Sequence, residues 1–214
     1  MNTDDIANYL RENPGFFAEY AELLSQICIP NPHGGQAIPI SDWQLQTLRE
    51  KNKALEAKLA ELIQFGEEND AIGERMHRLC VALLEARSIE GLLAVLYHNL
   101  REDFAVPHSA LRIWTHATSA PVAEYGPVSE ALKAYAAGLT QPFCGPNQNT
   151  EAAGWFGEVA DHIRSVALMP LSDGACIGML ALGSEDPRRF YPEMGTLYLR
   201  RLGELVSAAL ARDL

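Results

Sequence analysis

The stretch SDGACIGMLALGSEDPRRF, residues 172–190, decides the fold. It follows the apolar run IRSVALMPL of residues 163–171, and the dipeptide Asp173-Gly174 lies between the two apolar segments. Asp-Gly favours the tight turn that joins two antiparallel strands. We therefore predict strands over 163–171 and 175–184, joined as a hairpin.

Glycine and proline residues predict how closely other groups approach this hairpin and where its second strand ends. Gly174 and Gly178 flank a strand of small side chains, which leaves room for the close approach of a helix or a ligand. Asp186-Pro187 is expected to end the strand, because proline has no N–H to donate to a ladder. Phe190 is expected to fold back onto the core. The main role expected of this strand is to close the sheet. A role as the wall of a ligand pocket is the secondary expectation.

The elements around the hairpin are predicted from hydrophobic periodicity and capping residues. They are a helix from Ser88 to about Glu102, a strand over 108–116, its hairpin partner over 121–126, a short helix after the capping residue Ser129, a loop over 140–157, and a last helix from about Glu193 to Arg212. This order is α+β and predicts an antiparallel sheet with helices packed against it.

The N-terminal third is predicted to be helical. Two short helices within residues 3–28 are separated by Asn13-Pro14-Gly15, and residues 29–39 are typical of a loop or hinge because they hold three prolines and two glycines. The predicted division of the chain is a helical unit with its hinge at 1–40, a coiled-coil helix at 41–75 and the α+β domain at 76–214.

A heptad pattern begins in the second of these segments. Ser41 is the predicted helix cap, with Gln44 three residues later as in a capping box. The a and d positions of the heptad are occupied by Leu45, Leu48, Asn52, Leu55, Leu59 and Leu62, which we call the seam. A buried asparagine at an a position favours two parallel strands, and Lys51 at g would pair with Glu56 at e of a second chain. The seam predicts a homodimer; the alternative is an amphipathic helix packed on its own domain.

Composition limits the classes of function. The formal net charge of −11 argues against direct binding of DNA or RNA, which needs a concentrated basic face. No apolar run is long enough to span a membrane, and the N-terminus lacks the basic and apolar regions of a secretory signal. The four cysteines form no C-x-x-C motif, as is usual for reduced thiols. A cytoplasmic protein is therefore expected.

At this point the residues resemble a known family. Residues from IRSVALMPL to the final helix are similar to the closing hairpin and helix of a GAF domain, a small-molecule sensor fold. The segments YLRENPGFF, LREKNKALEAKL and GSEDPRRFYPEMGT resemble the bacterial family called domain of unknown function 484. The resemblance implies a GAF-like fold behind a helical, dimer-forming segment. It also implies a cavity of the kind in which better-known GAF domains bind nucleotides, tetrapyrroles or small metabolites.

The chain departs from the well-defined GAF subtypes, so the cofactor or ligand stays unknown. The Asn-Lys-Phe-Asp-Glu signature of cyclic-nucleotide GAF domains is absent, and no cysteine stands beside a histidine as in bilin attachment. The residues expected on the pocket strands and the covering loop are Trp114, Tyr125, Phe143, Cys144, Trp155, Phe156 and Arg164. Aromatic side chains commonly line pockets, although they also fill ordinary cores. Arg112, His162 and Arg164 would be the anchors of an anionic ligand.

Catalytic and metal motifs are incomplete. His77 and Cys80 share a helix face but supply only two metal ligands, and no metal site is expected. Walker, G-x-G-x-x-G and G-x-S-x-G motifs are absent. We expect a non-catalytic sensor or adaptor that binds a small molecule or a protein partner. The alternatives are a thiol-dependent reductase of a small metabolite using Cys144 and Cys176, and a ligand-free scaffold whose cavity is filled by the aromatic side chains.

Overall fold

The structure is a computed structural model and describes residues 2–29, 38–115, 122–148 and 151–212. The chain divides into two compact units, residues 1–68 and 69–214, which are described separately. The three-part division predicted from the sequence stays a prediction.

The first unit begins with short helices. They are α1 (Thr3–Glu12), α2 (Phe16–Glu19) and α3 (Ala21–Gln26), and a two-residue antiparallel pair follows, β1 (Cys28–Ile29) with β2 (Ile38–Pro39). The Asn2 side chain caps α1 by accepting from the Thr3 N–H at 2.8 Å, and the Asp5 carboxylate accepts from the Asn2 N–H at 2.8 Å. The predicted break at Asn13-Pro14-Gly15 is confirmed. Most of the predicted hinge, 30–37, lies outside the described residues.

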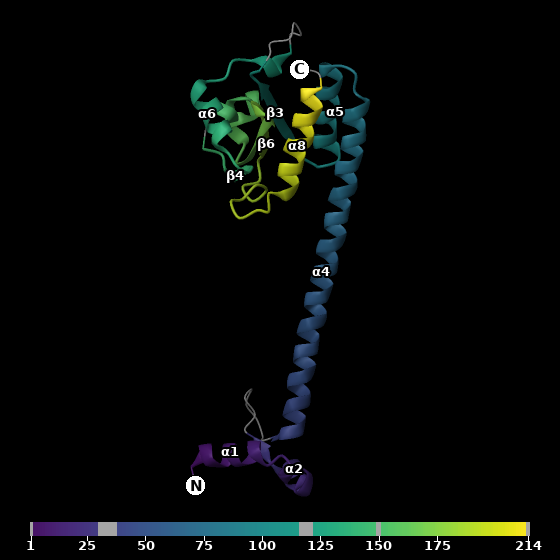
Figure 1. Ribbon diagram of the computed structural model, residues 1–214, viewed down its shortest axis with the longest axis vertical. Coiled ribbons are helices and arrows are strands. Elements are labelled where there is room, and N and C mark those ends of the chain that lie inside the picture. Colours follow the sequence, from purple (N-terminus) through teal and green to yellow (C-terminus); the bar gives the residue numbers. More distant parts are fainter. Residues whose placement is uncertain (1, 30–37, 116–121, 149–150, 213–214) are drawn as a thin grey trace. The chain divides into compact units, whose positions relative to one another are not determined.

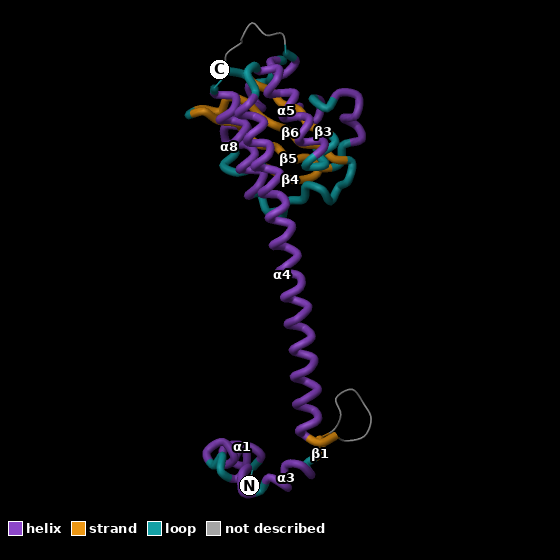
Figure 2. The backbone as a smooth tube through the Cα atoms, turned by 90° about the vertical axis from the view of Figure 1, so that its right-hand side faces the viewer, coloured by secondary structure: helices purple, strands orange, loops and turns teal. Residues whose placement is uncertain are grey.

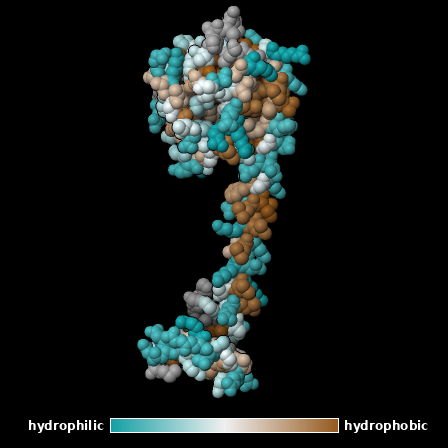
Figure 3. Space-filling view, in the orientation of Figure 1, coloured by the Kyte–Doolittle hydropathy of each residue, from teal (hydrophilic) through white to brown (hydrophobic). Residues whose placement is uncertain are grey.

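A single helix, α4 (Ile40–Glu85), carries the predicted seam. It begins at Ile40, so Ser41 lies inside the helix and the predicted cap at Ser41 is wrong. The described residues leave the seam leucines largely uncovered, because their exposed fractions run from 47% at Leu45 to 66% at Leu55. Figure 3 shows these hydrophobic side chains gathered along α4. A stripe of exposed leucines at heptad spacing is typical of a helix that pairs with another one.

The second unit is built on one antiparallel sheet (Figure 2). Its strands are β3 (His108–Ile113), β4 (Phe143–Pro146), β5 (Ser165–Asp173) and β6 (Ala175–Ser184), in the order β3-β6-β5-β4. The predicted β5–β6 hairpin is confirmed, and Gly174 at its turn has φ +71°, a conformation that favours glycine. The α+β class predicted from the sequence is confirmed.

Helices cover both faces of this sheet (Figure 1). The buried end of α4 packs with α5 (Ile89–Glu102) and α8 (Leu197–Ala211) on one face, which we call the helical face. The other face, which we call the cavity face, carries α6 (Glu130–Gly138), α7 (Glu151–Gly154) and the 3-10 helix η2 (Gly157–His162); a second 3-10 helix, η1 (Ala123–Tyr125), lies beside β3. Side chains of β5 alternate between the two, because Ala167 and Met169 join the helical-face core and Leu168 joins the cavity-face cluster.

Three predicted elements differ in the structure. Residues 123–125 form η1 and no strand, because the partner of β3 is β6, far along the chain. The predicted loop 140–157 contains the edge strand β4 as well as α7. The last helix begins at Leu197, after the Asp186-Pro187 turn and a non-helical segment. The caps at Ser88 and Ser129 are confirmed, since each hydroxyl accepts a first-turn N–H at 3.2 Å.

Candidate functional site: a cavity between α6, β4 and β5

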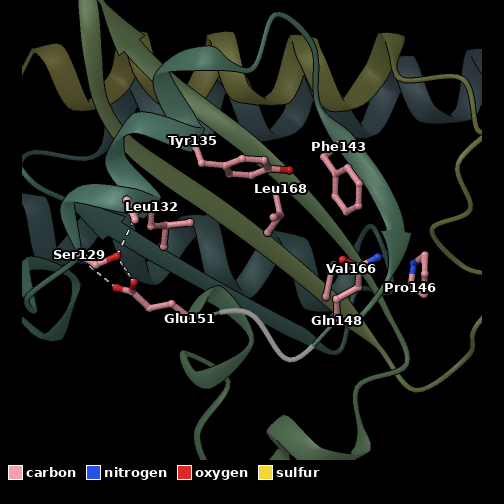
Figure 4. A pocket seen from close by; sticks show the side chains of 10 residues that line it. Ser129, Leu132, Tyr135, Phe143, Pro146, Gln148, Glu151, Val166 and Leu168 are labelled. Atoms are coloured by element: carbon pink, nitrogen blue, oxygen red, sulfur yellow. Dashed lines mark hydrogen bonds between the residues drawn. The ribbon is translucent and has the colours of Figure 1, made fainter.

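A cavity of about 340 Å³ opens on the cavity face, between α6 and the strands β4 and β5. Its lining residues come from α6, β4, α7 and β5 and from the segments beside them (Figure 4): Ser129, Ala131, Leu132, Tyr135, Phe143, Pro146, Gln148, Glu151, Val166 and Leu168. Cavities of this size with mostly apolar walls are typical of small-molecule sites. This cavity is therefore the candidate functional site.

Local packing explains why the cavity forms here. Leu132 and Ala136 are the buried residues of α6, and they pack with Leu168 in the cavity-face cluster. Phe143 lies on the edge strand β4. A Cβ added to Gly145 would lie 2.9 Å from Cζ of the Phe143 ring. Gly145 thus leaves the space that the Phe143 ring occupies. The helix and the ring hold the two sides of the cavity apart.

One end of the cavity is polar because α6 begins there. The Ser129 hydroxyl caps α6 by accepting from the Leu132 N–H, and it donates to Glu151 Oε2. The Ser129 backbone N–H donates to Glu151 Oε1 at 2.9 Å. These two hydrogen bonds lower the pKa of Glu151, so its carboxylate is ionised at neutral pH. The same bonds tie the start of α6 to α7.

The cavity offers a ligand apolar walls and a negative charge. Glu151 is the only charged residue among those that line it within the described part of the chain. Desolvation raises the pKa of the Tyr135 phenol, which is neutral at pH 7, and Gln148 is an uncharged amide. These groups favour a neutral or cationic molecule with an apolar body over an anion.

The residues predicted to bind a ligand are distributed over the unit, and only Phe143 lines this cavity. The Trp114 indole donates to the Cys176 carbonyl at 2.9 Å, at the far end of the β3–β6 pair. Trp155 lies under the Arg112 guanidinium, with 5.4 Å between Cζ and the ring centroid. These groups belong to the aromatic packing of the cavity face.

Tyr125, Cys144 and Arg164 lie elsewhere. Tyr125 and Cys144 pack with the helical-face core, across the sheet from the cavity. Arg164 is exposed and does not line the cavity; with Asn147 and Asp161 it lines a neighbouring hollow, which shares Gln148 with the cavity. The predicted strand around Tyr125 is η1 in the structure, and the predicted loop around Cys144 holds β4. Spacing along the chain also does not specify which sheet face a side chain occupies.

The prediction that Cys144 and Cys176 approach one another is wrong. Cys144 is opposite Ala167, whose partner on β6 is Leu182, six residues beyond Cys176. At about 3.3 Å per residue this is a separation of about 20 Å along the strand, and the two thiols lie on opposite faces. Burial also raises the pKa of both thiols, which disfavours the thiolate that a reductase would use.

The atoms that lie close to the glycines of β6 belong to the protein itself. A Cβ on Gly178 would lie 2.6 Å from the Arg112 carbonyl oxygen of the neighbouring strand. A Cβ on Gly183 would lie 2.9 Å from Cζ of Phe156. Gly178 therefore permits close strand pairing, and Gly183 makes room for the aromatic packing over the sheet.

The residues missed from the sequence stand mostly on α6 and just after β4. Ala131 and Tyr135 are four residues apart, so they share a face of the predicted helix, and this spacing was a usable signal. Gln148 and Glu151 lay in a segment predicted only as a loop, where no periodicity marks a lining residue.

Within the described residues, no group of three or more His, Cys, Asp or Glu side chains is placed to hold a metal ion. Within the same residues, no helix has the length and apolar character needed to cross a membrane.

The fold is that of a GAF-like α+β protein. The GAF domain of nlh2 from A. aeolicus, solved in an inactive state, is similar with a TM-score of 0.51 and 17% identity, covering 68% of this chain and 99% of that one. The GAF domain of a putative sensor histidine kinase from Pseudomonas syringae pv. tomato gives a TM-score of 0.47 at 15% identity, covering 70% and 92%.

The chain belongs to the family described as "Protein of unknown function, DUF484", which matches residues 1–213. The uncharacterized protein YigA of Salmonella typhimurium strain LT2 is 24% identical over 214 residues, covering 97% of this chain and 90% of the relative. The family predicted from the sequence is thus confirmed.

Proposed function

We propose that this chain is a non-catalytic, cytoplasmic sensor or adaptor that binds a small molecule in the α6–β4–β5 cavity. The observation that carries the proposal is the cavity itself, about 340 Å³ in volume with apolar walls and one carboxylate. Its charge favours a neutral or cationic ligand, such as an aromatic or aliphatic amine. The GAF-like fold supports the proposal by analogy only.

The competing hypothesis is a scaffold without a ligand. It predicts a cavity filled by aromatic side chains, and Trp155 and Phe156 do pack in the cavity-face cluster. Space remains beside Phe143, however, because α6 stands away from β4. That remaining space favours the binding module.

Native mass spectrometry of the protein purified from its own cells tests the proposal, followed by denaturation to release bound molecules. The expected result is one defined neutral or cationic compound. Ala131→Trp should block the mouth of the cavity and abolish this mass shift. Ala134→Trp is the matched control, because Ala134 is an exposed residue on the same helix outside the lining. Empty protein would favour the scaffold hypothesis, and a compound retained by Ala131→Trp would overturn binding in this cavity.

We also propose that the protein is a homodimer that pairs through the seam of α4. Five exposed leucines at heptad spacing and Asn52 at an a position support parallel pairing. The same spectra give the oligomeric state. A dimer is expected, and a monomer at every concentration would overturn the pairing whatever the cavity holds.

A further inference from the structure

A second cavity, of about 320 Å³, lies in the 69–214 unit on the opposite side of the sheet from the first. It is bounded by the part of α4 around Met76, by the start of α8 around Tyr198, and by the segment between Arg189 and Gly195. This cavity shares no lining residue with the candidate functional site.

The floor of this second cavity is apolar and held in place by hydrogen bonds. Phe190 is 3% exposed, and its backbone N–H donates to the hydroxyl of the buried Ser165 at 3.4 Å. The Ser165 hydroxyl in turn donates to the Asp186 carbonyl at 2.7 Å. Leu202 and Leu182 complete the floor and are 4% and 1% exposed. The cavity is therefore formed before any ligand enters.

Arg189 fixes one wall. Its guanidinium donates to the carbonyls of Phe104 and Ala105 at 2.8 and 3.4 Å. Ala105 has φ +51°, a conformation that a residue with a Cβ adopts only at a cost, and these bonds hold it there. The guanidinium thus stays at the rim of the cavity.

The charge of the second cavity is opposite to that of the protein as a whole. Arg75 and Arg189 are the only charged residues in its described lining, although the chain has 28 acidic and 17 basic residues. Arg75 is half-buried and makes no ion pair or hydrogen bond with the described residues. A guanidinium without a partner above an apolar floor matches an anion with an apolar tail.

We propose that this second cavity binds an amphipathic anion, a carboxylate on an apolar chain of about eight to ten carbons, with the carboxylate at Arg75 and the chain over Phe190. The proposal goes beyond the proposed function, since it concerns a different cavity with the opposite charge preference. Because the wall includes α4, such a ligand would contact the helix that carries the seam.

Isothermal titration of the full-length protein with octanoate, 1-octanol and octylamine tests this proposal. Octanoate is expected to bind about tenfold more tightly than octanol, because one charge-assisted hydrogen bond contributes about that factor. Arg75→Gln should remove the difference. Arg87→Gln is the matched control, since Arg87 is an exposed arginine outside the lining and the variant makes the same charge change.

Two further variants assign the binding to this cavity. Ile72→Trp should fill it and abolish octanoate binding, with circular dichroism confirming the fold. Ala131→Trp, which blocks the other cavity, should leave octanoate binding unchanged, so failure of one proposal does not imply failure of the other. Absence of octanoate binding, equal binding of octylamine, or an unchanged affinity in Arg75→Gln would overturn the proposal.

Discussion

Leu59→Ala is the most direct perturbation of the predicted seam. Leu59 is 58% exposed in the single chain. Full burial of a leucine side chain stabilises by about 2.5 kcal/mol, so covering that exposed fraction contributes about 1.5 kcal/mol. The position occurs twice in a symmetric dimer, which gives about 3 kcal/mol, or about a hundredfold in the dimer Kd. Alanine is a strong helix former, so the helix itself should not be weakened.

Sedimentation equilibrium over a wide range of concentrations measures this change. Leu84→Ala is the matched control, because Leu84 is 68% exposed on the same helix but lies outside the seam. It should leave the dimer Kd unchanged. An unchanged Kd in Leu59→Ala, or an equal loss in Leu84→Ala, would refute pairing through the seam.

Three further predictions concern residues of the second unit, one of them by comparison with Cys28 of the first unit. Gly178→Ala should lower the free energy of unfolding by about 1–3 kcal/mol in urea titration, because its Cβ meets a strand carbonyl, whereas Gly138→Ala, with nothing within 4 Å, should not. At pH 7.5 a thiol reagent should label the exposed Cys28 well before Cys144, whose pKa burial raises; equal rates would contradict the buried position. The lowered pKa of Glu151 means that its contribution to stability is complete above the ordinary glutamate pKa and is lost as pH falls through the lowered value. The difference in Tm between the unmodified protein and Glu151→Gln should therefore shrink on acidification, and a constant difference would contradict this.

The elements that the sequence predicted well are those with local signals. The β5–β6 hairpin follows from two apolar runs around Asp173-Gly174, and α5 and α6 follow from Ser88 and Ser129 as caps. Each signal acts within a few residues of the chain. Local signals predict these elements correctly because the tertiary packing favours the same local structure.

The elements that the sequence misplaced depend on long-range pairing. Residues 121–126 were assigned to β3 because they follow it closely, yet β3 pairs with β6, about 70 residues away. The edge strand β4 was missed because four residues that include glycine and Pro146 give no alternation to detect. A short strand with proline is acceptable at a sheet edge, where one side needs no partner.

The candidate site was harder to predict than the fold for a related reason. A strand presents alternate side chains to two faces, so an error in facing places a residue on the wrong side of the sheet. Phe143 and Cys144 are neighbours on β4, yet Phe143 lines the cavity and Cys144 packs with the helical-face core. The sequence named both residues, in a segment predicted as a loop, and could not choose between them.

That same alternation connects the cavity with α4. Val166 and Leu168 line the cavity, while Ala167 and Met169 on the same strand pack in the core that buries Leu79.

A ligand that displaces β5 would therefore change the packing on the opposite face of the sheet. There the end of α4 is held by Leu79 and Leu83, which are 0% and 1% exposed. Arg212, the residue that follows α8, adds a second contact, because its guanidinium donates to the carbonyls of Leu84 and Ala86 at 3.2 and 2.7 Å. In a sensor, the ligand must bind one conformation of such a packed junction more tightly than another. A ligand with equal affinity for both conformations does not shift the equilibrium between them. The junction of β5, α8 and α4 is the part of the 69–214 unit where these two states would have to differ.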